Sequence, residues 1–311
     1  MRIVSLLPSA TEILFAIGAG DRVVGVTHEC DYPAAARALP ALTASLLPPE
    51  LQPPGLPAQP GRAGRIDRHV RASVHAGSSL YALDAALLAR LAPDVIVTQE
   101  LCAVCAVSYE IVARAAKRIR GVGPAVISLE PASLEDVYAN ILTVGELAAA
   151  SAGAQALVDA LRSREAALRG RRAPQPAPRT LLLEWTDPPM SGGHWTPDLV
   201  ELAGGEPILA HPGANSQRLE WETVAAADPD VIIIAPCGYD LAQARAAAGD
   251  AAAGGGLPAL RAVRTGHAFV MDGNAYVNRP GPRLLDTAEI IAAALASIPA
   301  PAQAIETLSF S

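Results

Sequence analysis

Aromatic side chains are scarce in this sequence: phenylalanine, tryptophan and tyrosine together make up 4% of its 311 residues. Alanine, leucine and valine must therefore supply most of the packing in a chain that is 51% hydrophobic. The sequence also lacks an apolar run of the roughly 18 residues that a membrane-spanning helix needs. We therefore expect a large apolar core and no membrane insertion.

An excess of basic charge is missing as well. The formal net charge is −7, whereas a nucleic-acid-binding protein needs a basic surface to neutralise phosphates. The first residues show no apolar segment followed by a cleavage site, as a secretory signal would. We therefore expect no nucleic-acid partner and a cytoplasmic location for the chain as written, or a periplasmic location if a leader precedes it.

The common catalytic motifs are absent too. The sequence contains no G-x-S-x-G, no H-E-x-x-H and no phosphate-binding G-x-x-x-x-G-K-[ST]. These motifs place a nucleophile, a catalytic zinc or a nucleotide phosphate. We therefore predict a binding protein rather than an enzyme.

What the sequence does contain is an alternation of short apolar runs and helical segments, which is typical of α/β proteins with mainly parallel sheets. The expected strands are 3–6, 23–27, 94–98, 125–129, 180–184, 231–235 and 268–271. The expected helices are 82–91, 108–120, 197–203, 220–227 and 283–297, together with one that starts at a capping box of Ser9 and Glu12 and ends at Gly18. The stretches LLARLAPDVIVTQELC and VAAADPDVIIIAPC echo each other.

Residues 133–169 carry apolar side chains at helical spacing and almost no helix breaker, and a bend near residues 151–153 is the alternative to a straight helix. We therefore predict two Rossmann-like lobes with mainly parallel sheets, joined by a single long backbone helix. The expected domains are an N-terminal lobe at 1–130, the linking helix at 131–172 and a C-terminal lobe at 173–311.

All four cysteines follow strand-like runs: Cys30, the C-x-x-C pair Cys102 and Cys105, and Cys237. Ligands in open α/β sheets gather beyond the carboxyl ends of the strands, and thiolates suit zinc or an iron–sulfur cluster. One hypothesis is therefore a shared metal site made by these four residues. The alternatives are a redox dithiol at the C-x-x-C pair alone and ordinary buried cysteines.

Other candidate ligand contacts also lie after expected strands. His28 could complete a metal shell or bind the metal of a chelate axially, glycines let a backbone approach a ligand, and an arginine suits carboxylates. The candidates are His28, Gly193, His194, Trp195, Asn274, Tyr276, Asn278 and Arg279.

Several stretches spread over the chain carry a family resemblance: RIVSLLPSATEILFAIGAGDRVVGV, LAPDVIV, TLLLEWTDPPMSGG, LVELAGGEPI and GPRLLDTAEII. With them the chain resembles the substrate-binding proteins of cobalamin and iron-chelate ABC importers. The resemblance implies a monomer that holds a metal chelate in a cleft between its lobes and delivers it to an ABC permease.

The resemblance also implies roles for single residues. Tyr276 falls on an aromatic cleft position and Trp185 near one, while Glu29 stands where the family has a tyrosine. Glu222 matches an acidic residue that docks onto the permease, and Asp84 lies two residues from the matching position in the other lobe.

Three hypotheses follow. The first is capture of a cobalamin-like corrinoid or another metal chelate, which rests on the resemblance. The second is a cysteine-ligated iron–sulfur cluster or transition metal such as zinc, which rests on the residues. The third is a redox enzyme that uses the C-x-x-C pair.

Overall fold

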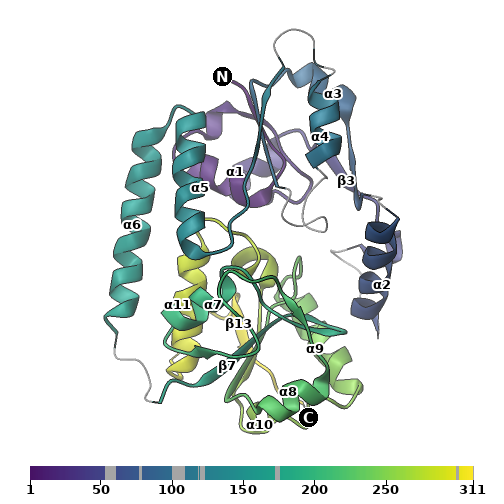
Figure 1. Cartoon of the computed structure of the whole chain (residues 1–311), viewed down its shortest axis with the longest axis vertical. Helices are drawn as coiled ribbons and strands as arrows, with labels where there is room; N and C mark the ends of the chain where they lie inside the picture. The colour runs from purple at the N-terminus through teal and green to yellow at the C-terminus, as the bar shows by residue number, and fades with distance from the viewer. Residues whose placement is uncertain are drawn as a thin grey trace. The chain divides into compact units, whose positions relative to one another are not determined.

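The computed structural model describes residues 1–52, 61–76, 79–99, 109–117, 119, 123–171, 176–298 and 301–310 (Figure 1). The chain forms two compact units. The first comprises Met1–Gln52, His69–Pro131 and Glu135–Leu161, and the second comprises Pro53–Arg68, Ala132–Leu134 and Arg162–Ser311. In the part of the chain that the structure describes, no helix has the length and apolar character that crossing a membrane requires. The domain boundaries expected from the sequence stay a prediction.

The first unit is built on a four-stranded sheet of order β2-β1-β5-β6, in which every pair is parallel. Its strands are β1 (Ile3–Ser5), β2 (Val23–Gly25), β5 (Val95–Thr98) and β6 (Ala125–Ser128). From β1 the chain continues to its neighbour β2 toward one edge of the sheet, and from β5 it continues to its neighbour β6 toward the other edge. Such a switch point between neighbouring strands is where open α/β sheets bind ligands, beyond the carboxyl ends of the strands.

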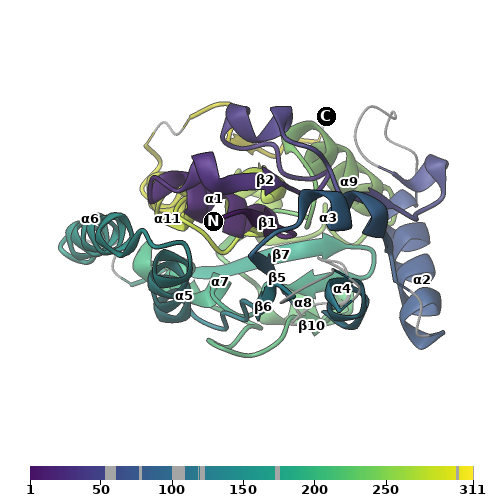
Figure 2. The ribbon, with the colours of Figure 1, turned by 90° about the horizontal axis from the view of Figure 1, so that it is seen from above.

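Alternation of side chains fixes the faces of this sheet. Val4 and Ile96 are neighbours in register and share a core with Leu88 and Val112 from the helices α3 and α4. Helix α1 lies against β1 (Figure 2). The helices named here are α1 (Pro8–Ala16), α3 (Ala85–Leu91) and α4 (Tyr109–Ala116), and a separate antiparallel pair consists of β3 (Thr43–Ser45) and β4 (Tyr81–Leu83).

The capping box expected at the start of α1 is wrong. The helix begins at Pro8, its N-cap is Leu7, and no side chain caps it. Proline at the first helical position has a φ angle suited to the helix and no N–H that needs a partner. The hydroxyl of Ser9 is consequently buried inside the first turn, where it has no hydrogen-bond partner.

The second unit has a mixed sheet of order β10-β8-β7-β11-β12-β13, with β9 paired to β7. The central strands β7, β11 and β12 are parallel, whereas β8, β10 and β13 run antiparallel to their neighbours. The parallel prediction therefore holds for the centre of this sheet and not for its margins. The strands are β7 (Arg179–Thr186), β8 (Pro189–Ser191), β9 (Glu206–Pro207), β10 (Gln217–Arg218), β11 (Val231–Ile234), β12 (Ala268–Met271) and β13 (Ile305–Thr307).

Helices cover both faces of this sheet (Figure 1). Leu181 and Ile232 point into a core shared with the helices α8 and α9, while Leu182 and Ile233 point into one shared with α7 and α11. Both faces of the central strands are therefore buried, which explains their uninterrupted apolar sequences. The helices are α7 (Thr196–Leu202), α8 (Trp221–Ala227), α9 (Leu241–Ala253), α10 (Arg261–Arg264) and α11 (Leu284–Leu295).

The single linking helix is wrong, because two helices, α5 (Leu134–Leu147) and α6 (Ser151–Arg169), occupy its place. Ala149 has a left-handed φ of 48°. The N–H of Ala150 donates to the Gly145 carbonyl at 2.7 Å, and the N–H of Ala149 donates to the Glu146 carbonyl at 3.0 Å. This pair of bonds is the Schellman ending of a helix, which normally has glycine at the left-handed position. Alanine there leaves the break without its usual sequence signal.

Candidate functional site

In the first unit, the chain leaves β2 and passes directly to His28, which is exposed to solvent. Its ring Nδ1 lies 2.7 Å from the hydroxyl oxygen of Thr43 in β3. Protein atoms around the ring desolvate it and lower the pKa of His28 from its ordinary value. Because a hydrogen bond at one ring nitrogen orients the imidazole, the ring is held with Nε2 available to a ligand.

Tyr81 in β4 lies beside this histidine. The two ring centroids are 5.7 Å apart, with the rings tilted by 53°, and the Tyr81 hydroxyl donates to a Glu29 carboxylate oxygen at 3.3 Å. The antiparallel pairing of β3 with β4 brings Thr43 and Tyr81 to the same place. The sequence predicts a site role for neither residue.

Cys30 is buried, and its thiol lies among hydroxyl groups of the first unit. Its sulfur is 3.1 Å from the Thr11 hydroxyl and 3.2 Å from the Thr27 hydroxyl, and Thr11 also donates to Ser5 at 2.8 Å. Its backbone N–H donates to the Thr27 carbonyl at 3.2 Å. That turn directs the side chain into the core.

The structure does not support a cysteine-ligated metal site. Cys237 belongs to the second unit, where it is half-buried and donates its N–H to the Glu184 carbonyl at 3.0 Å. Cys102 and Cys105 lie outside the described residues. Among those described, no group of three or more His, Cys, Asp or Glu side chains could hold a metal ion.

In the second unit, an aromatic pair lies where β7 and β11 end. The rings of Trp185 and Tyr239 meet edge to face, with their centroids 5.3 Å apart. The Trp185 indole N–H donates to the Asp187 carbonyl at 3.1 Å. The Tyr239 hydroxyl is buried and has no hydrogen-bond partner in the described part of the chain, and burial raises the pKa of Tyr239. The sequence reasoning found Trp185 and missed Tyr239, which follows Cys237 by two residues.

The segment from Gly193 to Trp195 forms a packed turn before α7. Trp195 is 8% exposed, and its indole N–H donates to the Val277 carbonyl at 2.9 Å. His194 has a φ of 53°, and its Nε2 lies 3.1 Å from the Asn215 side-chain oxygen. A Cβ at Gly193 would overlap the backbone of Ser216. The turn thus contacts two other loops of the unit, one at Asn215 and Ser216 and one at Val277.

The loop after β12 holds the remaining candidates. The backbone N–H of Asn278 donates to the Gly273 carbonyl at 2.9 Å, which closes a turn of π-helix, and the Asn278 side-chain amide donates to the same carbonyl at 3.1 Å. Arg279 is buried and donates to the Asn274 side-chain oxygen at 2.9 Å. The ring of Tyr276 is half-buried, with the guanidinium of Arg283 5.7 Å from its centroid.

The two residues expected to dock onto a permease are both exposed. Glu222 lies in the first turn of α8. Asp84 is the N-cap of α3, and its carboxylate accepts the Leu87 N–H at 2.8 Å. The structure therefore gives Asp84 a capping role whether or not it also meets a partner.

Solved structures share this fold over nearly the whole chain. The periplasmic vitamin B12-binding protein of Vibrio cholerae is 22% identical, with a TM-score of 0.64 over 95% of this chain and 96% of that one. A periplasmic heme-binding protein of Pseudomonas aeruginosa is 23% identical, with a TM-score of 0.68 over 99% and 98%. The periplasmic heme-binding protein of Roseiflexus sp. RS-1 is 25% identical, with a TM-score of 0.67 over 95% and 98%.

The sequence comparisons agree with the fold. The vitamin B12-binding protein of Yersinia pestis is 23% identical over 302 residues, which cover 96% of this chain and 88% of the relative. The resemblance, the two-lobed α/β fold and the prediction of a binding protein rather than an enzyme are thereby confirmed. Because the model of the periplasmic binding protein family matches residues 3–275, the chain belongs to that family.

Proposed function

We propose that this protein captures a planar metal chelate, either a cobalamin-like corrinoid or a porphyrin, and hands it to an ABC permease. The relatives described as vitamin B12-binding and heme-binding support this ligand class. The cysteine-ligated cluster and the redox enzyme have no support in the described residues or in the relatives, and neither is proposed. The relatives are periplasmic, so we propose a periplasmic location in place of the cytoplasmic one.

The environment of His28 carries this proposal. A histidine binds a metal in its neutral form, and the lowered pKa of His28 keeps the ring neutral over a wider pH range. The bond between Nδ1 and Thr43 orients the ring, as outer partners of metal-bound histidines generally do. Nε2 is then the atom that would occupy the open axial position of the chelated metal.

The aromatic pair of the second unit supports the same ligand class. Trp185 and Tyr239 carry large apolar rings at the carboxyl ends of neighbouring strands. Such rings favour stacking against another planar π-system. Of the two, Trp185 is half-buried and therefore retains surface for a ligand.

The direct test is titration of the purified protein with hydroxocobalamin and, separately, with hemin, followed by visible absorption. We expect one of them to bind with a spectral change that marks axial ligation. His28→Ala should remove that change and weaken binding by at least about 10- to 100-fold, the loss that mutation of an outer partner of a metal ligand already causes. The matched control is His267→Ala, an exposed histidine of the second unit next to Thr265. Unchanged spectra in both variants, or no binding of either chelate, would contradict the proposal.

The pH dependence sharpens this test. Because the pKa of His28 lies below its ordinary value of 6.5, its imidazole remains mostly neutral at pH 6.5. Affinity should therefore hold from pH 8 through 6.5 and fall only at lower pH, when a proton competes for Nε2. A fall centred at pH 6.5 or above would show that His28 is not the axial group.

We also propose that Glu222 and Asp84 contact the permease. Both are exposed acidic side chains at the starts of helices, and complementary charge mainly affects how fast partners associate. Glu222→Lys should therefore slow delivery of the chelate to permease-containing vesicles without changing chelate affinity. Asp84→Asn keeps a capping side chain and isolates the effect of charge.

A further inference from the structure

Helix α2 (Arg62–His75) is the feature that the proposed function leaves unexplained. It is one continuous helix, yet its residues 62–68 pack within the second unit and the rest belongs to the first. We call residues 62–68 the α2 latch. Four of its side chains or backbone positions are buried: Arg62, Ala63, Gly64 and Ile66.

One ion pair, which we call the clasp, holds the latch against the rest of the second unit. Arg218 of β10 donates from two guanidinium nitrogens to the two carboxylate oxygens of Asp67, at 3.2 and 2.8 Å. The Asp67 side chain is 13% exposed, and the contact raises the pKa of Arg218. A bidentate arginine–carboxylate pair fixes orientation as well as contributing energy.

The latch also packs closely on the turn between β7 and β8. A Cβ at Gly64 would overlap the carboxylate of Asp187. Asp187 is the residue whose carbonyl accepts the Trp185 indole N–H. The latch therefore lies directly beside the aromatic pair.

The packed latch places the Tyr239 hydroxyl in an unfavourable environment. Its side chain is 6% exposed, and its hydroxyl has no hydrogen-bond partner among the residues that the structure describes. The positive charge of Arg62, the first latch residue, is close enough to act on the Tyr239 hydroxyl. A buried hydroxyl without a partner destabilises the state that contains it, so the seated latch leaves an unmet polar group that water or a ligand could satisfy.

We propose that the α2 latch is a retractable cover over Trp185 and Tyr239, held down by the Asp67–Arg218 clasp. Lifting it rehydrates the Tyr239 hydroxyl and exposes the aromatic pair of the second unit to an incoming ligand. The last step rests on the proposed function, whereas the cover and its clasp are properties of the ligand-free protein.

The first experiment is hydrogen exchange of the latch amides in the ligand-free protein. Arg218→Ala and Asp67→Ala should each raise exchange by about tenfold, because local opening governs exchange. The double variant should rise no further than either single one, as expected for two residues of one interaction. Arg71→Ala, an exposed arginine farther along α2, is the control. Exchange that is unchanged, or additive in the double variant, would overturn the clasp.

The second experiment asks whether the latch covers the aromatic pair. Nitration of Tyr239 by tetranitromethane, located by mass spectrometry, should be slow in the unmodified protein and rise about tenfold in Arg218→Ala. Arg218→Lys keeps the charge without the fork and should give an intermediate rate. Faster latch exchange with unchanged nitration would show that the latch lifts without uncovering Tyr239, which overturns the proposal.

The ligand step has its own readout. If the cover gates the site, Arg218→Ala should raise both the association and the dissociation rate of the chelate while its affinity changes little. Unchanged rates with faster nitration would refute gating. If neither hydroxocobalamin nor hemin binds at all, the proposed function fails, and the exchange and nitration results still decide whether the cover exists.

Discussion

The two units repeat one junction at the amino ends of their central strands and differ at the carboxyl ends. In both, a helix ends in a left-handed residue, a proline and an aspartate follow, and a buried strand begins. The left-handed residues are Ala92 and Asp228, each with a φ of 41°. Asp94 accepts the backbone N–H of Arg2, the residue before β1, at 2.7 Å, and Asp230 accepts that of Arg179, the first residue of β7, at 2.9 Å.

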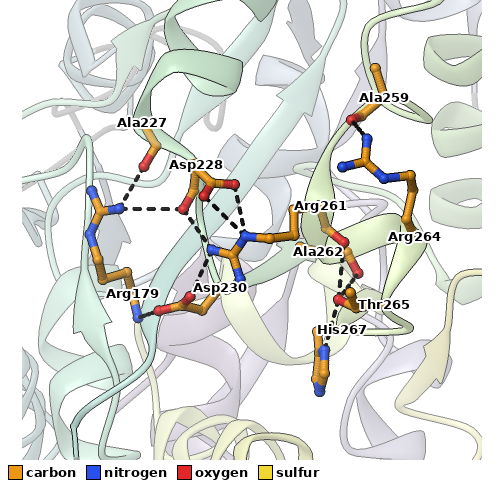
Figure 3. Close-up of polar contacts among 10 residues, drawn as sticks. All are labelled: Arg179, Ala227, Asp228, Asp230, Ala259, Arg261, Ala262, Arg264, Thr265 and His267. Carbon is orange, nitrogen blue, oxygen red and sulfur yellow. Dashed lines mark hydrogen bonds and ion pairs between the residues drawn. The ribbon is translucent and has the colours of Figure 1, made fainter.

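The arginine that donates this N–H has a second role in each unit. In the first, the side chain of Arg2 donates to the Leu91 carbonyl at 2.7 Å. In the second, the side chain of Arg179 donates to the Ala227 carbonyl at 2.6 Å (Figure 3). Each guanidinium thereby satisfies a carbonyl that the helix end leaves without a partner.

The carboxyl ends of the strands carry no such repeat. The first unit places His28 and Tyr81 there, both bonded to oxygen groups. The second places Trp185 and Tyr239 there, and no described residue forms a hydrogen bond with the Tyr239 hydroxyl. The amino ends of the strands thus share one structural junction, whereas the carboxyl ends hold the candidate ligand contacts and differ between the units. Under the proposed function, His28 of the first unit would bind the metal and the aromatic pair of the second unit would stack on the chelate ring.

The largest effects should come from glycines that permit close packing in each unit. A Cβ at Gly153 would overlap the Ile17 carbonyl, and one at Gly273 would overlap the Pro236 carbonyl. Because backbone cannot move aside as a side chain can, each Gly→Ala change should cost about 3 kcal/mol of unfolding free energy, measured by urea denaturation. Gly249→Ala, in a helix with open space around it, should instead add up to about 1 kcal/mol. Equal effects at all three positions would contradict the packing argument.

The next largest effect should come from substitutions that remove the contribution of one unit to chelate binding. Trp185→Ala should weaken chelate binding about 30-fold, which corresponds to the loss of about 2 kcal/mol typical of an aromatic anchor. The spectral mark of axial ligation should persist in this variant, whereas His28→Ala removes it. If Trp185→Ala abolishes the mark as well, the two units do not have separate roles.

The sequence predicts the shared junction well, because the helix–Pro-Asp–strand pattern is local. The sequence does not predict positions that depend on turn conformation or on the pairing of distant segments. Cys30 follows its strand as expected, but the turn bonded to Thr27 buries the thiol. Tyr81 reaches His28 only through the pairing of β3 with β4. The break at Ala149 has no glycine to mark it. A residue's position at the end of a strand therefore predicts the region of a site but not which side chains contact a ligand there.

The junctions themselves should differ in strength. Asp230 accepts the Arg179 N–H at 2.9 Å and a guanidinium nitrogen of Arg261 at 2.8 Å (Figure 3), whereas Asp94 accepts the Arg2 N–H and lies 3.8 Å from the terminal amine. Because the Asp230 side chain is 39% exposed and solvent screens its ion pair, Asp230→Asn should cost about 1.5 kcal/mol and the more exposed Asp94→Asn about 0.5 kcal/mol, by urea denaturation at pH 7. A reversed order would contradict the comparison.

Lowering the pH should remove the difference in unfolding free energy between the Asp230→Asn and Asp94→Asn variants. The hydrogen bond from Arg261, and then that from the Arg179 N–H, lower the pKa of Asp230 below its ordinary value of 3.8. A carboxylate with a lowered folded pKa contributes stability above its unfolded pKa and loses that contribution as pH falls through the folded pKa. The penalty of Asp230→Asn should therefore be constant from pH 7 to about pH 5 and vanish at lower pH. A penalty that persists in strong acid would arise from packing.

The smallest effect should come from the half of α6 that belongs to the second unit. Arg164 donates to Asp286 and to Glu289 of α11, with the Glu289 contact at 3.0 Å. All three side chains are more than a third exposed, so solvent screens them and Arg164→Ala should cost about 1 kcal/mol or less. The penalty should shrink further in 1 M salt, where the screening length is about 3 Å. Gly153 lies in the other half of the same helix, and its packing against backbone is insensitive to salt. A salt-independent loss at Arg164 would mean that its aliphatic stem, rather than its charge, anchors the helix, and packing would then secure α6 in both units.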